Sequence, residues 1–203
     1  LFRLPWPVGS NIRAVDRSQP MLDHVWPGPP GTADVGDWSA LPYVNAPFDR
    51  IICDGGLAFF GPASIDGVRA EAGRVLRPGG LIVARVYAWN RDETLDRIIS
   101  DVISGAASTA NELRIRSWSA LQSSLAGGVP LGFAFDALTE RLGSLEQLIK
   151  QSGLDAAQFE PFAATAGSTL RYTMWPTSDL IDAWTRSGEF VHVSTTLPEH
   201  QFG

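Results

Sequence analysis

The fold of this chain is decided by FDRIICDGGL at residues 48–57 and RVLRPGGLIV at residues 74–83. The first stretch contains a short, mostly apolar run, residues 49–54, that ends in an acidic residue before two glycines. The second leads through the turn Pro78-Gly79-Gly80 into another apolar run, residues 81–87. Short runs that are rich in branched residues and bounded by turn residues are typical of buried parallel strands. We therefore predict two neighbouring parallel strands.

The segment between these runs has the spacing of a helix. Within residues 63–76 the apolar side chains fall on one helical face: Ile65, Val68, Ala72, Val75 and Leu76. Strand, helix, turn and strand in this order make the βαβ unit of a parallel sheet. A further short strand is expected upstream, at residues 11–16. The sequence therefore predicts an α/β fold with a mostly parallel, twisted sheet flanked by helices.

The chain has a different character after residue 90. Residues 91–152 show helical spacing almost throughout, including an apolar stripe over residues 133–149, with a break at Gly127-Gly128-Val129-Pro130. A last section contains a helix at residues 178–187 and a strand at residues 189–194. Helices between two sheet strands would form an insertion or lid, and such segments commonly contact substrates.

Length and composition indicate one globular domain. With 203 residues, of which 44% are hydrophobic and 19% charged, the chain can bury a substantial core and is too apolar to be disordered. Its formal net charge is −6, and Lys150 is its single lysine. Because no basic run is present, the positive surface of a nucleic-acid-binding protein is not predicted, and we do not expect a nucleic acid as partner.

Cysteine usage and hydropathy bear on the compartment. Cys53 is the single cysteine, so it cannot form an internal disulfide, and its simplest role is that of a small buried hydrophobic residue. No apolar stretch approaches the roughly eighteen residues that a membrane span needs. Residues 1–8 lack the layout of a signal peptide. We expect a soluble, cytoplasmic protein without membrane contact.

The first residue that can carry chemistry is Asp16, at the end of the predicted strand at residues 11–16. A carboxylate at the carboxyl end of a parallel strand can accept hydrogen bonds from both ribose hydroxyls of a nucleoside cofactor. Each such charged hydrogen bond contributes about 1.5–3 kcal/mol. The alternative, in which Asp16 caps the following helix, fits this segment equally well.

Two further segments carry acidic residues. Asp37 lies twenty-one positions after Asp16, within ADVGDWSALP at residues 33–42. It can accept a hydrogen bond from an adenine amino group while the neighbouring backbone bonds a ring nitrogen, although a polar turn would explain the same residues. Asp54 and the two glycines after it stand where a parallel strand opens onto the ligand crevice of such folds. Glycine permits close approach of a ligand, but it also serves ordinary turns.

Taken together, the order and spacing of these segments resemble the Rossmann-like class I methyltransferases that depend on S-adenosylmethionine. In that family a strand ending in Asp binds ribose, and a Gly-Asp pair meets the adenine. A Phe-Asp strand and an Arg-x-Leu-(Lys or Arg)-Pro-Gly-Gly turn follow. The resemblance covers roughly residues 1–90. It implies a Rossmann-like α/β fold, S-adenosylmethionine as cofactor and methyl transfer as the activity.

The resemblance also implies cofactor-binding roles for six residues: Asp16, Arg17, Asp37, Trp38, Asp54 and Gly55. Asp16 corresponds to the acid that binds ribose, and Arg17 to the residue that flanks the adenine. Asp37 and Trp38 correspond to the adenine–amide pair, and Asp54 and Gly55 to the loop beneath the sulfonium. No catalytic residue and no metal site is predicted. We expect one domain with a cofactor-binding part, a helical insertion or lid before the final strands, and a C-terminal helix and strand region, at residues 1–90, 91–152 and 153–203.

One motif of the family is absent from the sequence. It is a strand followed by a Gly-x-Gly loop, but only fifteen residues precede Asp16, and Gly9 stands alone among them. A βαβ unit needs about thirty residues, and the missing strand would lie at the centre of the sheet, where open edges are unfavourable. We therefore expect the natural protein to have further N-terminal residues that supply this strand and loop, with residues 1–7 as the tail of the connection. Residues 201–203 stop before the second of the two antiparallel strands that close the fold.

The methyl acceptor and any general base are not identified by the sequence. His24, His192 and His200 are more simply structural than catalytic. Aromatic residues of the second half fit an acceptor pocket and a packed core equally well: Trp118, Phe133, Phe135, Tyr172 and Trp175. With seven tryptophans and a net negative charge, we expect a small-molecule acceptor that is largely apolar or cationic.

Two other functions compete with methyl transfer. A non-catalytic binding or regulatory protein would keep the same sheet and lack turnover. A nicotinamide-dependent oxidoreductase also has an acid after its second strand. The Pro-Gly-Gly turn before Leu81, the Gly-Asp-Trp spacing and the lack of a paired Tyr and Lys signature argue against the oxidoreductase. The sequence leaves the oligomeric state open.

Overall fold

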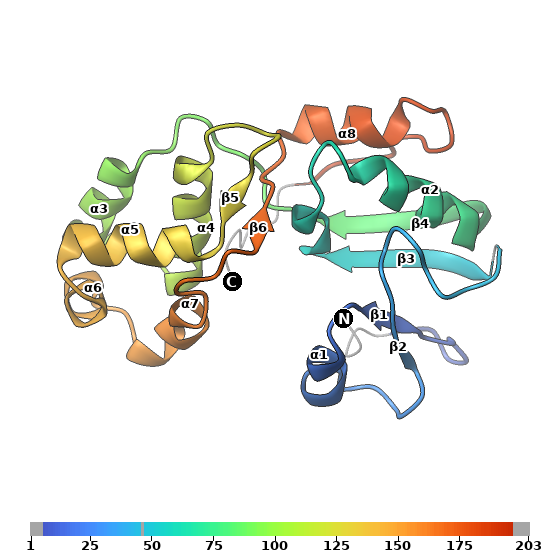
Figure 1. The fold of residues 1–203 in the computed structure, drawn as a ribbon, viewed down its shortest axis with the longest axis horizontal. Helices are drawn as coiled ribbons and strands as arrows, with labels where there is room; N and C mark the ends of the chain where they lie inside the picture. Colours follow the sequence, from blue (N-terminus) through green and yellow to red (C-terminus); the bar gives the residue numbers. More distant parts are fainter. Residues whose placement is uncertain (1–5, 46, 197–203) are drawn as a thin grey trace.

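The computed structural model describes residues 6–45 and 47–196. It is a mixed α/β structure in which short strand pairs are combined with helices (Figure 1). The strands are β1 (Ala14–Asp16), β2 (Ala33–Val35), β3 (Phe48–Asp54), β4 (Leu76–Arg85), β5 (Val129–Pro130) and β6 (Arg171–Tyr172). The α-helices are α1 (Gln19–His24), α2 (Ile65–Val75), α3 (Leu95–Ser104), α4 (Ala110–Leu121), α5 (Gly132–Leu142), α6 (Leu145–Ser152), α7 (Glu160–Ala163) and α8 (Thr177–Thr185). Short 3-10 helices are η1 (Gly56–Phe59) and η2 (Ala156–Phe159).

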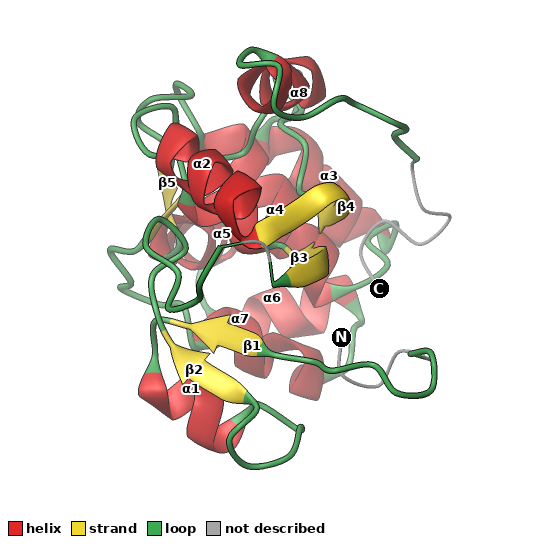
Figure 2. Cartoon of the chain, turned by 90° about the vertical axis from the view of Figure 1, so that its right-hand side faces the viewer, coloured by secondary structure: helices red, strands yellow, loops and turns green. Residues whose placement is uncertain are grey.

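The described strands form three separate two-stranded sheets, visible as distinct pairs in Figure 1, and Figure 2 shows the β1–β2 pair apart from the β3–β4 pair. β1 pairs in parallel with β2, with Asp16 opposite Val35. β3 pairs in parallel with β4, with Asp54 opposite Arg85. β5 and β6 pair antiparallel. The single twisted sheet that we expected is not formed, because no strand in the described part of the chain pairs with both β1 and β3.

The predicted unit of strand, helix and strand is confirmed by β3, α2 and β4. α2 and α8 cover one face of the β3–β4 pair (Figure 1), and Cys53, Ile65 and Val68 are buried there. The opposite face is open in the described structure, since Leu81 and Val83 remain 40% and 49% exposed. Burial on one face alone is unusual for a parallel pair, because parallel sheets are generally covered on both faces.

The predicted Pro-Gly-Gly turn lies inside β4 and takes the form of a bulge. Leu76 pairs with Phe48 and Leu81 with Arg50, so the residues from 77 to 80 project from the ladder. Gly79 has a φ of +75°, in the left-handed region that glycine adopts without a Cβ penalty. The bulge shifts the register of the residues that follow it and so sets Arg85 opposite Asp54.

Residues 91–152 are largely helical, as predicted, but they form four helices and the short strand β5. Thr94, Thr109 and Ser144 are the N-caps of α3, α4 and α6, and each side-chain oxygen accepts a hydrogen bond from the backbone three residues later. The apolar stripe predicted over residues 133–149 is divided at Gly143, whose φ of +95° ends α5. None of the described helices has the length and apolar character of a membrane span.

The end of the described chain corrects one prediction. The helix expected there is α8, but the strand predicted at residues 189–194 is not formed. Phe190 packs against Trp184 of α8, with ring centroids 5.3 Å apart. Val191 and Val193 are 81% and 75% exposed, so the segment buries no face that would stabilise a strand.

The buried apolar side chains form two cores. One core lies among the helices α3 to α7, and we call these helices the helical lobe. The other core lies between the β3–β4 pair, α2 and α8. Met174 belongs to the first core and Trp175 to the second. The backbone N–H of Trp89 donates to the Trp175 carbonyl at 3.0 Å, and the backbone N–H of Thr173 donates to the Ala58 carbonyl at 2.6 Å. Residues 173–175 therefore join the helical lobe to the strands.

Arg116 of α4 holds three carboxylates of the helical lobe. Its guanidinium lies 2.7 Å from Glu93, 2.7 Å from Asp101 and 3.0 Å from Glu112, and its side chain is only 13% exposed. Removing the guanidinium would leave partly buried negative charges without a counter-charge. The Arg141–Asp96 pair of the same lobe is different, because both of its side chains are largely in solvent.

We expect Arg116→Met to lower the free energy of unfolding by about 3–5 kcal/mol, since breaking a buried ion pair costs this much. Arg141→Met is the matched control, with an expected loss below about 1 kcal/mol, as for other surface pairs. Urea denaturation followed by tryptophan fluorescence measures both values. Equal losses in the two variants would contradict the importance of the Arg116 cluster.

Candidate functional site

Asp16 is the last residue of β1 and is half-buried. Its Oδ1 accepts a hydrogen bond from the Ser18 backbone N–H at 2.8 Å. Ser18, and not Asp16, is the N-cap of α1, because its hydroxyl oxygen accepts a hydrogen bond from the Met21 N–H. Within residues 6–45 and 47–196 no group donates to Oδ2 of Asp16, so this oxygen is available to a ligand.

The segment after β2 lies beside Asp16. The Gly36 N–H donates to the Asp16 carbonyl at 3.0 Å and extends the pairing of β1 with β2. Asp37 Oδ1 accepts hydrogen bonds from the Ser39 hydroxyl at 2.5 Å and the Ser39 N–H at 2.8 Å. These two hydrogen bonds lower the pKa of Asp37, and the positive charge of Arg17 lowers it further. Asp16, Arg17 and Asp37 therefore lie together at the carboxyl ends of β1 and β2.

The side chains of Trp38 and Arg17 join this edge to the residues after β3. Trp38 stacks on Phe60, with ring centroids 6.2 Å apart. It also approaches Gly56 closely, since a Cβ on that residue would lie 3.2 Å from the Trp38 ring. The Arg17 guanidinium lies over the Phe59 ring, 5.8 Å from its centroid. The carboxyl ends of β1, β2 and β3 therefore converge, the position at which open parallel sheets bind ligands.

Asp54 and Gly55 connect β3 to the end of β4. The Asp54 carboxylate forms an ion pair with Arg85, and the Gly55 N–H donates to the Arg85 carbonyl at 2.9 Å. Gly55 has a φ of +76°, which favours glycine, and a Cβ there would lie 3.4 Å from the Tyr87 ring. Gly55 thus lets the backbone pass close to Tyr87, and a side chain at this position would be strained.

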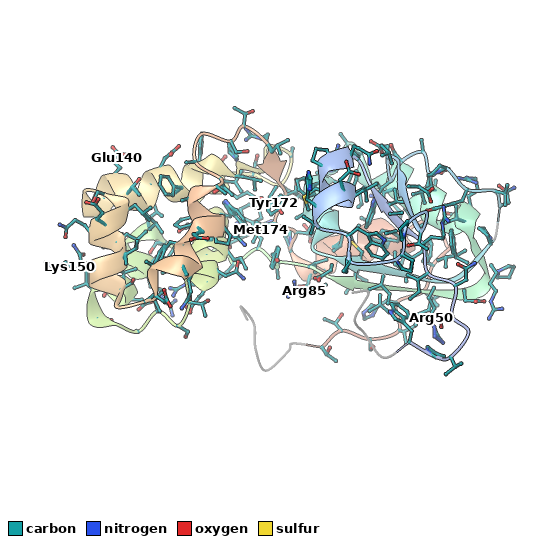
Figure 3. All side chains as sticks on the ribbon, turned by 90° about the horizontal axis from the view of Figure 1, so that it is seen from below. Arg50, Arg85, Glu140, Lys150, Tyr172 and Met174 are labelled. Carbon is teal, nitrogen blue, oxygen red and sulfur yellow. The ribbon has the colours of Figure 1, made fainter. Side chains whose placement is uncertain are left out.

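Tyr87 also lines a cavity of about 440 Å³ between the strands and the helical lobe. Its polar lining comes from the residues at the end of β4, from the start of α4 and from η2: Arg85, Tyr87, Thr109, Asn111, Arg114 and Gln158. Figure 3 shows Arg85 in the middle of the molecule, between the helical lobe and the β3–β4 pair. The volume lies within the range of about 300–1,000 Å³ that is typical of small-molecule sites.

Sequence reasoning did not identify this cavity. Arg85 and Tyr87 belong to the predicted strand at residues 81–87, so the strand-end argument that selected Asp54 applies to them as well. Arg114 and Gln158 carry no comparable signal. They reach the cavity through the packing of α4 against η2 and α7, which a single sequence does not reveal.

The aromatic residues that we singled out do not line this cavity. Trp118 and Trp175 are buried in the two cores, where their indole N–H groups donate to backbone carbonyls at 3.0 Å and 2.9 Å. Tyr172 packs edge-on against Trp118, and Phe133 is 52% exposed. Core packing therefore accounts for Trp118 and Trp175.

Of the three histidines, the two in the described part of the chain lie away from the strand ends. His24 is exposed in the last turn of α1. His192 lies in the irregular segment after α8, contrary to its predicted place in a strand, and its Nε2 is 2.9 Å from the Thr195 hydroxyl. His200 lies outside the described residues. Among those residues no group of three or more His, Cys, Asp or Glu side chains is placed to hold a metal ion.

Cys53 is confirmed as a small buried hydrophobic residue. It lies in β3 with 1% of its surface exposed, on the face covered by α2. Burial raises the pKa of its thiol from 9.0 to about 11. The thiol is therefore neutral at physiological pH and carries no nucleophilic role.

Comparison with known protein families finds a match for the N-terminal part of the chain. Residues 2–84 match the family model described as "Methyltransferase domain". No match was found among curated proteins or among solved structures. The matched segment includes all six residues to which we assigned a cofactor role in the sequence.

We expect Cys53 of the native protein to react with dithionitrobenzoate at least about a hundredfold more slowly than the same thiol in denaturing urea. A pKa of about 11 in place of 9.0 reduces the thiolate fraction to about one hundredth, and burial further limits access. Because the chain has one cysteine, the absorbance at neutral pH reports on this residue alone. Equal rates in buffer and in urea would show that Cys53 is accessible.

Proposed function

Since residues 2–84 belong to the class I family of S-adenosylmethionine-dependent methyltransferase domains, we propose that the chain transfers a methyl group from S-adenosylmethionine to a small-molecule acceptor. The observation that carries this proposal is the convergence of the carboxyl ends of β1, β2 and β3. We also propose that the two parallel pairs are parts of one Rossmann-like arrangement, because their strand ends meet at one edge.

The residues at this edge fit an adenosyl group. Asp16 Oδ2 would accept hydrogen bonds from the ribose hydroxyls, since Oδ1 already binds the Ser18 N–H. Asp37 would accept from the adenine amino group through Oδ2, since Oδ1 binds Ser39. Arg17 would flank the adenine, and the Trp38 backbone would bond a ring nitrogen of the adenine. The Asp54–Gly55 segment would lie beneath the sulfonium, where the absence of a side chain on Gly55 permits close approach.

The role of the chain in the proposed catalysis is to position two reactants. When bound, S-adenosylmethionine supplies a methyl group on a positively charged sulfur, which is already activated toward a nucleophile. Holding reactants in line can contribute about 7–11 kcal/mol to lowering the barrier. In the proposed arrangement Asp16 and Asp37 bind parts of the cofactor that are remote from the reacting centre, so their role is to orient the methyl donor.

We propose the helical lobe as the part that helps to bind the acceptor. The cavity beside Tyr87 combines the end of β4 with Arg114 from α4 and Gln158 from η2. Tyr87 lies against Gly55, so the cavity is separated from the proposed cofactor loop by one side chain. Residues 91–152, predicted as an insertion or lid, thus provide one wall of the proposed acceptor site.

We expect Asp16→Asn to weaken binding of S-adenosylhomocysteine by roughly five- to thirtyfold. A hydrogen bond to a charged acceptor contributes about 1–2 kcal/mol more than one to a neutral amide, which corresponds to this range. Asparagine retains the acceptor for the Ser18 N–H, so the turn is preserved. Isothermal titration calorimetry of the full chain measures the dissociation constant.

Asp23→Asn is the matched control for this substitution. It removes the same charge seven positions away, on the exposed side of α1, where Asp23 accepts a hydrogen bond from Gln19 at 2.6 Å. Binding by this variant should equal that of the unchanged chain. The proposal fails if both variants lose affinity equally, or if the unchanged chain shows neither heat of binding nor thermal stabilisation with S-adenosylhomocysteine.

A further inference from the structure

Arg114 is a partly buried cation without a carboxylate partner among the residues described. Its guanidinium donates to the Pro161 carbonyl at 3.4 Å and to the Asn111 side-chain oxygen at 2.5 Å, both uncharged acceptors. Its Nε is buried, and in the described part of the chain nothing accepts its proton. Burial lowers the pKa of Arg114, because the surroundings disfavour its positive charge. A bound anion would relieve this penalty.

The start of α4 adds positive potential at the same place. This helix has twelve residues, and the cavity is lined by its N-cap Thr109 and by Asn111. Helix N-termini carry a partial positive charge that favours anions. The Ala110 N–H of α4 donates to the Gln158 side-chain oxygen at 3.3 Å and the Glu112 N–H to the Thr109 hydroxyl oxygen at 3.0 Å, so the helix contributes through its dipole. Glu112 of the first turn does not pair with Arg114 and does not line the cavity, because its carboxylate is bound by Arg116 at 3.0 Å and by the Ser108 N–H at 2.9 Å.

The guanidinium groups at the cavity are held by aromatic rings. Arg114 lies over Trp118, 5.2 Å from the ring centroid, and Arg85 lies over Tyr87 at 5.9 Å. Asp54 neutralises Arg85, whereas Arg114 is not neutralised, and no aspartate or glutamate of the described chain lines the cavity. A planar guanidinium that is already oriented loses little entropy when it binds a carboxylate or phosphate.

We propose that this cavity binds a carboxylate or phosphate group of the methyl acceptor through Arg114, with the dipole of α4 adding to the positive potential there. The inference rests on the proposed methyl transfer and names the chemical class of its substrate. Phe162, Pro161 and Tyr87 form apolar walls, so the acceptor has an apolar body and one anionic group. This assignment replaces the apolar or cationic acceptor expected from composition, because a cationic group would meet Arg114.

The test uses three probes that share a phenol ring: 4-hydroxybenzoate, 4-hydroxyphenyl phosphate and the neutral 4-hydroxybenzamide. Each is titrated into the full chain by calorimetry. We expect at least one anionic probe to bind at least about tenfold more tightly than the amide, or about 1.4 kcal/mol. The tighter of the two anions identifies carboxylate or phosphate as the preferred group. Equal binding of all three probes, or binding of none, overturns the proposal.

Arg114→Gln should abolish this preference and leave the affinity for the amide unchanged. Arg91→Gln is the matched control, because Arg91 also lies over a tryptophan, Trp89 at 4.6 Å, but does not line the cavity. Arg114→Lys retains the positive charge without the planar guanidinium, so it should weaken binding of the anionic probes less than Arg114→Gln does. It takes the place of Arg114→Gln in the test if that variant fails to fold. Anion preference that survives both Arg114 substitutions contradicts the proposal.

Binding of S-adenosylhomocysteine separates this inference from the function on which it rests. Arg114 lies outside the residues proposed to bind the cofactor, so Arg114→Gln should bind S-adenosylhomocysteine as the unchanged chain does. If the unchanged chain binds the anionic probes and not S-adenosylhomocysteine, the anion site stands and methyl transfer fails. If it binds S-adenosylhomocysteine and does not distinguish the probes, methyl transfer stands and the anion site fails.

Discussion

Trp38 holds together two strand pairs that share no backbone hydrogen bond in the described structure. Its ring stacks on Phe60 and lies against Gly56, so the ends of β1 and β2 are fixed next to the end of β3. α2 adds a second connection, because Glu71 accepts a hydrogen bond from the Leu41 N–H at 2.8 Å. The position of the proposed cofactor residues therefore depends on side-chain packing. In a continuous sheet, backbone hydrogen bonds between neighbouring strands would fix that position instead.

The boundary between the two cores is where both halves of the proposed reaction meet. Tyr87 lies against Gly55 on the strand side and lines the cavity shared with the helical lobe. Residues 173–175 return across the same boundary and bury one side chain in each core. A change in the packing of either core would move the two sides of the site relative to each other, so stability and substrate positioning are coupled there.

Local signals explain how much of this structure was predictable. β3 and α2 were predicted because each carries its own apolar pattern and bounding turn residues, and Asp16 and Asp54 followed from their places at strand ends. The prediction of a strand at residues 189–194 was wrong, because alternating apolar residues do not by themselves provide a neighbouring strand to pair with. In the structure Phe190 packs on α8. The site at Arg114 could not be predicted, because its character comes from the missing counter-charge, which only tertiary packing determines.

Charge differs on the two sides of Tyr87, and this difference gives the proposed site a direction. The strand side carries more carboxylates than cations: Asp16, Asp37 and Asp54 against Arg17 and Arg85. The cavity side carries Arg114 and the positive end of α4. A cationic donor is favoured on the first side and an anionic acceptor on the second, and each would be repelled from the other's place. Arg85 stands at the boundary, since it neutralises Asp54 and also lines the cavity. The distribution of charge alone can therefore orient both reactants before any group takes part in proton transfer.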